Sequence, residues 1–119
     1  MGETWIPIVL ENPRTGARSE ELVALADTGA TLTMVPTAAL RDIGVAPVGR
    51  ITVRLADGRR AAREVGDAIV AINGDSTACR VIFGETGDGV LLGLTVLEQL
   101  GLAVDPVQRR LVPTDFLLS

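Results

Sequence analysis

The stretch LVALADTGA, residues 22–30, decides the fold of this chain. Its first five residues are all apolar, which predicts a β-strand buried on both faces. The strand runs directly into Asp27-Thr28-Gly29. A carboxylate at the end of a buried strand needs a reason, because burying a lone charge is costly. One interpretation is a plain turn, where this tripeptide is common, and the other is a catalytic acid.

Outward from this stretch, turn residues separate short apolar segments. Asp57-Gly58 and Asn73-Gly74 predict hairpin turns, since both dipeptides favour left-handed backbone. Pro36 and Gly44 mark the start and the stop of a short helix. We expect strands at 5–10, 18–26, 31–35, 50–55, 59–64, 65–72, 77–83, 90–93, 102–104 and 109–112, and short helices at 36–43 and 95–100. The fold class predicted is therefore all-β with one or two short helices.

Composition excludes several kinds of chemistry. The 119 residues predict one domain, 1–119, and the net charge of −4 disfavours binding to nucleic acid. The chain has no His, Tyr or Lys, so nucleophiles activated by His, imidazole metal sites and Schiff-base lysines are excluded. Acid–base chemistry near neutral pH falls to carboxylates, and we expect no metal and no cofactor.

The single cysteine and the hydropathy pattern bear on location. Cys79 cannot form an intramolecular disulfide, and we interpret it as a buried, inert thiol. No apolar run approaches 20 residues, and the first residues lack the pattern of a signal peptide. We therefore expect a cytoplasmic protein with no membrane partner.

A second motif, Leu91-Leu92-Gly93, precedes the second predicted helix. Together with Asp27-Thr28-Gly29-Ala30 it resembles the retropepsin-like (clan AA) single-domain aspartic proteases of the bacterial type. In that family an apolar strand ends in Asp-Thr/Ser-Gly-Ala, a hairpin flap follows, and two apolar residues and a Gly lead into a short helix. The resemblance extends from about residue 5 to residue 112 and implies a small closed β-barrel with a flap.

The resemblance also implies an activity, aspartic endopeptidase, and a partner, a second copy of the chain. Two carboxylates about 3 Å apart cannot both ionise cheaply, so one stays protonated while the other activates a water. This chain has one Asp-Thr-Gly, so the second carboxylate must come from a homodimer. Asp27, Thr28 and Gly29 would be the catalytic residues. Substrate contacts to an extended peptide would come from Ala30, Ala56, Asp57, Gly58, Arg59 and Leu92.

The chain departs from the viral pattern at two positions. Viral members usually carry an Asp–Arg pair where this chain has Thr31 and Leu94. Both charges are absent together, which favours the non-viral branch. Arg59, Arg60 and Arg63 lie on or near the hairpin tip. They form either a solvated face or a site that selects acidic or C-terminal groups.

Other segments also have two interpretations. Trp5 is expected in the core or in a dimer sheet, and the tail 113–119 either supplies dimer-sheet strands or frays. The glycines between 84 and 89 and the acidic residue Asp88 are interpreted as turn chemistry. Two alternative functions stay open: a non-catalytic peptide-binding or dimerisation module on the same fold, and a small β-barrel with Asp27 merely in a turn.

Overall fold

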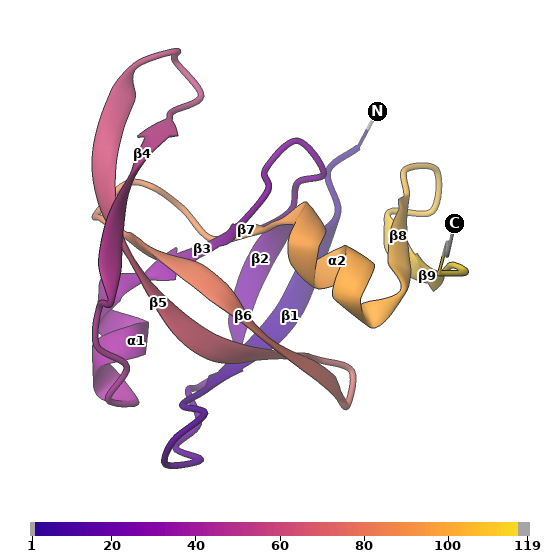
Figure 1. Cartoon of the computed structure of the whole chain (residues 1–119). Coiled ribbons are helices and arrows are strands. Elements are labelled where there is room, and N and C mark those ends of the chain that lie inside the picture. The colour runs from indigo at the N-terminus through magenta and orange to yellow at the C-terminus, as the bar shows by residue number, and fades with distance from the viewer. Residues whose placement is uncertain (1, 117–119) are drawn as a thin grey trace.

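The structure is a computed structural model that describes residues 2–116 (Figure 1). Strands dominate it, and two short helices interrupt them, so the all-β class is confirmed. In chain order the elements are β1 (Trp5–Glu11), β2 (Leu22–Ala26), β3 (Thr33–Pro36), α1 (Thr37–Asp42), β4 (Gly49–Arg54), β5 (Arg60–Ile72), β6 (Asp75–Gly84), β7 (Leu91–Leu92), α2 (Leu94–Leu100), β8 (Leu102–Asp105) and β9 (Arg110–Pro113).

Seven of the strands form one sheet in the order β1-β2-β7-β3-β6-β5-β4. A further pairing of β1 with β5 closes the strands into a ring, from which β4 and the first part of β5 extend as a hairpin (Figure 1). The short strand β7 lies between β2, to which it is parallel, and β3, to which it is antiparallel. This insertion brings the end of β2 beside the start of α2. Strands β8 and β9 form a separate two-stranded sheet.

The core fills the inside of the ring. Its largest fully buried side chains come from β1, β3, α1, β5, β6, β7 and α2, and include Ile8, Leu40, Val70, Phe83 and Leu92. Burial of such side chains supplies the main driving force for folding, at roughly 1.5–3 kcal/mol each.

The outer face of the ring corrects two expectations. Strand β2 is buried on one face only: Ala24 is fully buried, whereas Val23 is 55% exposed. Trp5, paired with Leu25 across β1 and β2, is 53% exposed, so it does not lie in the core, and the dimer-sheet alternative stays a prediction. The all-apolar sequence of β2 predicts a strand covered on both faces, but in residues 2–116 nothing covers the outer face at Trp5 and Val23.

Strand β5 is one continuous strand of 13 residues where two were predicted. Its first part pairs only with β4, and its second part pairs with β6 and β1. The change from polar to apolar residues at Glu64 and Val65 therefore marks the point where the strand enters the core, not a break in the backbone.

The predicted hairpin turns are confirmed. At Asn73-Gly74 both residues have positive φ, 51° and 84°, which suits a tight turn between β5 and β6. At the other hairpin Gly58 has φ 87° and the N–H of Leu55 donates to the carbonyl of Arg59 at 2.7 Å. Both predicted helices are present, and α2 ends at Leu100, where Gly101 caps it in the left-handed conformation.

The predicted strand 18–26 is shorter in the structure. Only residues 22–26 are a strand, and residue 18 makes a single bridge to Glu11. The tail continues past β9 to Phe116, and the expected tail residues 117–119 lie outside the described residues. In the part described, neither helix has the length and hydropathy needed to cross a membrane.

Candidate active site

Asp27 is the first residue after β2, and the backbone around it is held from both sides. Its N–H donates to the carbonyl of Leu92 at 2.9 Å, and the preceding N–H, of Ala26, donates to the carbonyl of Thr4 at 2.8 Å. The Asp27 side chain is half-buried, and its Oδ1 accepts from the N–H of Gly29 at 2.9 Å. The carboxylate is thus oriented by its own loop while it stays accessible from one side.

The residues that follow Asp27 form a tight, exposed turn. The N–H of Ala30 donates to the carbonyl of Asp27 at 3.1 Å, and Thr28 and Gly29 are exposed. A Cβ added at Gly29 would lie 3.2 Å from Asp27 Oδ1, so a side chain there would crowd the carboxylate. The structure therefore brings the three predicted catalytic residues and Ala30 together at one surface turn.

Helix α2 begins against this turn. The N–H groups of Leu94 and Thr95 donate to the carbonyls of Ala30 and Thr31 at 2.7 and 3.1 Å. This close approach requires Gly93, because an added Cβ would lie 2.5 Å from the backbone carbon and oxygen of Leu32. The Leu92 side chain is fully buried, so Leu92 supports the loop from the core side.

Thr33 belongs to the site and was missed by the sequence analysis. Its Oγ1 accepts from the N–H of Gly93 at 2.9 Å, across 60 residues of chain, and its side chain is buried. The hydroxyl satisfies a donor that would otherwise be buried without an acceptor. A signal was available: a single Thr between Leu32 and Met34 indicates a buried polar group that needs a partner.

The predicted substrate residues at the hairpin tip lie apart from this turn. Ala56, Asp57, Gly58 and Arg59 are all exposed. Asp57 accepts from the N–H and the Nε of Arg59 at 3.0 and 2.6 Å, and these bonds hold the pKa of its carboxyl below the usual value. Within residues 2–116 no hydrogen bond or ion pair joins the tip to the Asp27 turn.

The base of the hairpin does reach the site. Ile51 and Val53 on β4 pack against a small buried cluster of Met34, Val65 and Ile82, which also contacts Leu32 and Leu91. We call the cluster of Met34, Val65 and Ile82 the apolar floor, because the base of the hairpin packs on it next to the Asp27 turn.

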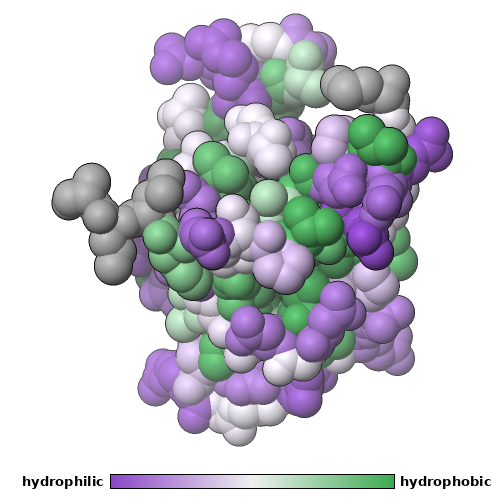
Figure 2. Space-filling model, turned by 90° about the vertical axis from the view of Figure 1, so that its right-hand side faces the viewer, coloured by the Kyte–Doolittle hydropathy of each residue, from purple (hydrophilic) through white to green (hydrophobic). Residues whose placement is uncertain are grey.

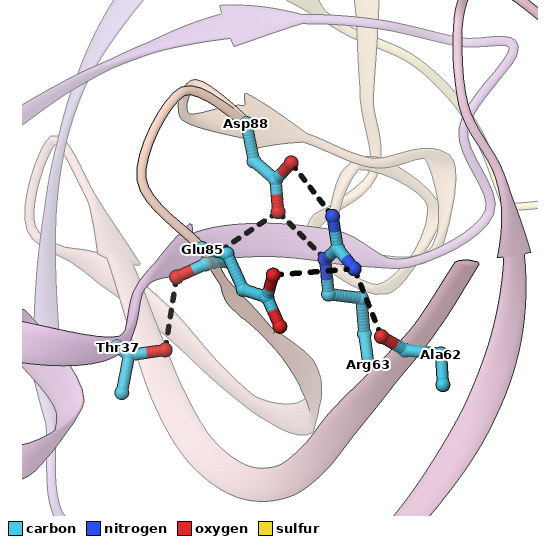
Figure 3. A network of polar contacts seen from close by, with 6 residues as sticks. Thr37, Ala62, Arg63, Glu85 and Asp88 are labelled. Carbon is cyan, nitrogen blue, oxygen red and sulfur yellow. Dashed lines mark hydrogen bonds and ion pairs between the residues drawn. The ribbon is translucent and has the colours of Figure 1, made fainter.

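The expectation that Arg63 belongs to a solvated basic face is wrong. Its side chain is only 10% exposed, and it forms a bidentate ion pair with Asp88 (Figure 3). Arg63 Nε and one terminal nitrogen lie 2.7 and 3.0 Å from the two Asp88 oxygens. This bond holds the pKa of the Asp88 carboxyl below its usual value. Asp88 is therefore more than the turn residue predicted.

Other candidate groups lie outside the turn. Burial, with a smaller contribution from the Asp67 charge, raises the pKa of the Cys79 thiol to about 11, which fits an inert thiol. In the described part of the chain, no group of three or more His, Cys, Asp or Glu side chains could hold a metal ion. Three surface hollows, of about 410, 450 and 270 Å³, are lined by residues other than Asp27, Thr28 and Gly29.

Residues 17–99 match the family of the gag-polyprotein putative aspartyl protease. A search of curated proteins finds no match.

Solved structures share the fold. The solution structure of simian foamy virus (mac) protease has 22% identity and a TM-score of 0.55, covering 82% of this chain and 94% of that one. The EIAV protease complexed with the inhibitor HBY-793 has 17% identity and a TM-score of 0.61, with coverages of 84% and 89%. A retropepsin-like aspartic protease from Rickettsia conorii has 18% identity and a TM-score of 0.50, with coverages of 88% and 89%.

Proposed function

Because this chain belongs to the gag-polyprotein putative aspartyl protease family, we propose that it is an aspartic endopeptidase in which Asp27 is the catalytic carboxylate. The observation that carries the proposal is the setting of Asp27. Its backbone is fixed by β7, while its carboxylate is oriented by Gly29 and remains accessible. Rigidly positioned acid–base groups at an accessible surface are what hydrolysis requires.

The proposed reaction needs two carboxylates, and one chain offers one at this turn. A second copy would bring its own Asp27 opposite the first, so the proposed enzyme is a homodimer with a shared site. In this arrangement Thr28 would donate its hydroxyl to the backbone of the partner. The exposure of Thr28 supports this role, because its side chain is free to meet a second copy.

The surface near α2 supports a second copy as well. Figure 2 shows a face of the molecule on which apolar groups gather in the middle, among neutral and some hydrophilic ones, while hydrophilic groups dominate the upper and lower ends. Large exposed apolar side chains include Trp5 on β1, Leu94 on α2 and Phe116 after β9. Apolar side chains that a monomer leaves exposed are typical of interaction surfaces.

In the proposed mechanism, the ionised Asp27 removes a proton from a water while the protonated Asp27 of the second copy hydrogen-bonds the substrate carbonyl. The water oxygen bonds to the carbonyl carbon and forms a tetrahedral intermediate. The C–N bond then breaks, and the leaving nitrogen takes a proton from a carboxyl group. Each turnover consumes one water and releases two peptides.

The β4–β5 hairpin is the proposed cover of the peptide. Ala30 lies at the Asp27 turn, and Ala56, Asp57, Gly58 and Arg59 lie at the exposed tip, where closure would bring them to an extended substrate. Leu92 supports the Asp27 turn from the core side, because its carbonyl accepts from the N–H of Asp27.

The test compares the wild-type protein with Asp27→Asn on a diverse peptide mixture between pH 4 and 7, with cleavage read by mass spectrometry. Wild-type cuts that the variant does not make are expected. Asp27→Asn chains added in about ninefold excess should then reduce wild-type activity about tenfold, because most wild-type chains would sit in mixed dimers.

Two results would contradict the proposal. Equal cleavage by Asp27→Asn would show that Asp27 takes no part in the reaction. Full wild-type activity in the presence of excess variant would show that the two copies do not share one site. Tight peptide binding without cleavage by either protein would favour a non-catalytic binding module.

A further inference from the structure

The ion pair between Arg63 and Asp88 joins two segments that border the proposed site (Figure 3). Arg63 lies on β5 in the hairpin, and Asp88 lies in the loop between β6 and β7. Both side chains are about 90% buried, at 10% and 11% exposure. A carboxylate held through two parallel N–H···O bonds is fixed in orientation as well as in distance.

The position of Arg63 on the hairpin makes the pair unusual. Arg63 stands opposite Ile51, on the face of the hairpin that packs on the apolar floor. The exposed arginines of the same hairpin, Arg50 and Arg54, point to its other face. A charge on the inner face needs a counter-charge, because leaving it buried and unpaired would be strongly destabilising. Asp88 supplies the counter-charge, and Glu85 lies 3.6 Å away as a second acid.

The acidic end of the pair is itself anchored. Asp88 Oδ2 also accepts from the N–H of Glu85 at 2.7 Å, which closes the loop on itself. The start of the loop is held where Thr37 Oγ1 donates to the carbonyl of Gly84 at 2.9 Å. The loop therefore cannot follow the hairpin without breaking bonds of its own.

The other end of the loop leads to Asp27. The carbonyl of Val90 accepts from Leu25 and the carbonyl of Leu92 accepts from Asp27, both at 2.9 Å. Only three residues of chain lie between Asp88 and Leu92. The ion pair thus completes a connection from the hairpin, through the loop and β7, to the strand that carries Asp27.

We propose that Arg63 and Asp88 are positioning residues, which latch the β4–β5 hairpin to the loop beside β7 and so set the position of the hairpin relative to the Asp27 turn. This inference rests on the proposed function, in which the peptide binds between the hairpin and the turn. The pair acts through the hairpin and touches no substrate. Apolar contacts are not directional, so those at the hairpin base allow the hairpin to slide. The bidentate ion pair is directional and therefore favours one position of the hairpin.

The chain contains a matched control. Arg80 and Asp67 also form an ion pair at β5, at 3.1 Å, but their side chains are 49% and 56% exposed. Asp67 and Arg80 already face each other in the β5–β6 ladder, so this pair adds no connection between separate segments. An exposed pair of this kind contributes little.

The first experiment measures amide hydrogen exchange on the full chain for wild type, Arg63→Ala and Arg80→Ala. Arg63→Ala should speed exchange of residues 49–65 and 85–90 by about tenfold, because the hairpin opens more often. Arg80→Ala should leave these segments unchanged, and the β8–β9 hairpin should be unchanged in both. If Arg63→Ala fails to fold, Asp88→Asn takes its place, because Asn keeps an oxygen that can accept from the N–H of Glu85. Arg63→Lys keeps the positive charge and should restore part of the protection of these amides against exchange.

The second experiment measures peptide cleavage. Arg63→Ala should raise KM about tenfold and leave kcat within about twofold, because the bonds that hold Asp27 are untouched. Identical exchange and identical KM for Arg63→Ala and Arg80→Ala would overturn the latch. If the wild type cleaves no peptide, the proposed function fails, and the exchange comparison alone decides whether the latch exists.

Discussion

The Asp27 turn and the tip of the β4–β5 hairpin are the two halves of the proposed site, and they are held in opposite ways. The turn is bonded to β7, to α2 and to the N-terminal segment, through Leu92, Leu94 and Thr4. Within residues 2–116 the tip is bonded only inside its own hairpin, through Arg54, Leu55, Asp57 and Arg59. One half belongs to the folded body, and the other extends from it.

The difference teaches how one short chain can combine rigidity with access. Groups that move protons must keep their geometry, which the bonds around Asp27 provide. A cover must open for the substrate, and segments with few contacts outside themselves open at low cost. Changes at the turn should therefore affect the stability of the whole chain, whereas changes at the tip should stay local.

Gly93→Ala should have the largest effect, because it breaks the rigid half. The new Cβ would lie 2.5 Å from the backbone of Leu32, and backbone cannot yield as a flexible side chain can. We expect the free energy of unfolding to fall by about 3 kcal/mol, with loss of peptidase activity. Urea denaturation measures the change. Gly49→Ala is the control, since its Cβ would meet only Val65 at 3.6 Å. Equal stability of the two variants would refute the packing argument.

Thr33→Val should have the second-largest effect on stability. It keeps the shape of the side chain but leaves the N–H of Gly93 buried without its acceptor. The expected loss is about 1–2 kcal/mol in the free energy of unfolding. Thr33→Ser retains the hydroxyl, so it should recover part of this loss. A Val variant more stable than the Ser variant would show that the hydrogen bond contributes little.

Gly58→Ala tests the half of the proposed site that extends from the folded body. Gly58 has φ 87°, and among the described residues an added Cβ would meet nothing within 4 Å, so the cost is backbone strain alone. We expect a loss of about 1 kcal/mol in the free energy of unfolding, and a larger effect on KM than on kcat. Gly58→Asn should be milder, because Asn tolerates left-handed backbone. A global loss as large as that of Gly93→Ala would contradict the comparison.

The smallest effect concerns pH at the tip. The bonds from Arg59 lower the pKa of Asp57 below 3.8, so the ionised carboxylate stabilises the folded turn. This contribution is complete above 3.8 and is lost as the pH falls through the lowered pKa. The amide NMR shift of Arg59 should titrate with a midpoint below 3.8, and Asp57→Asn should abolish the titration. A midpoint at or above 3.8 would show that the turn does not hold the carboxylate.

Sequence reasoning succeeded where local chemistry decides structure. The turns at Asp57-Gly58 and Asn73-Gly74, the stop at Gly101 and the two short helices follow from backbone preferences of a few residues. It failed where a distant part of the chain decides burial. Val23 on β2 is exposed because nothing in the described chain covers the outer face of the ring there, and Arg63 is buried because it pairs with Asp88.

By itself the sequence determined the all-β class, the position of the Asp27 turn and the second motif at Leu91-Leu92-Gly93. The tertiary structure alone decided how these parts meet. Thr33 reaches Gly93 across 60 residues, and Arg63 reaches Asp88 across 25. The physical reason is the insertion of β7 between β2 and β3. Strand pairing of this range is set by the packing of the whole ring, whereas turns and helix ends are set by the residues that form them.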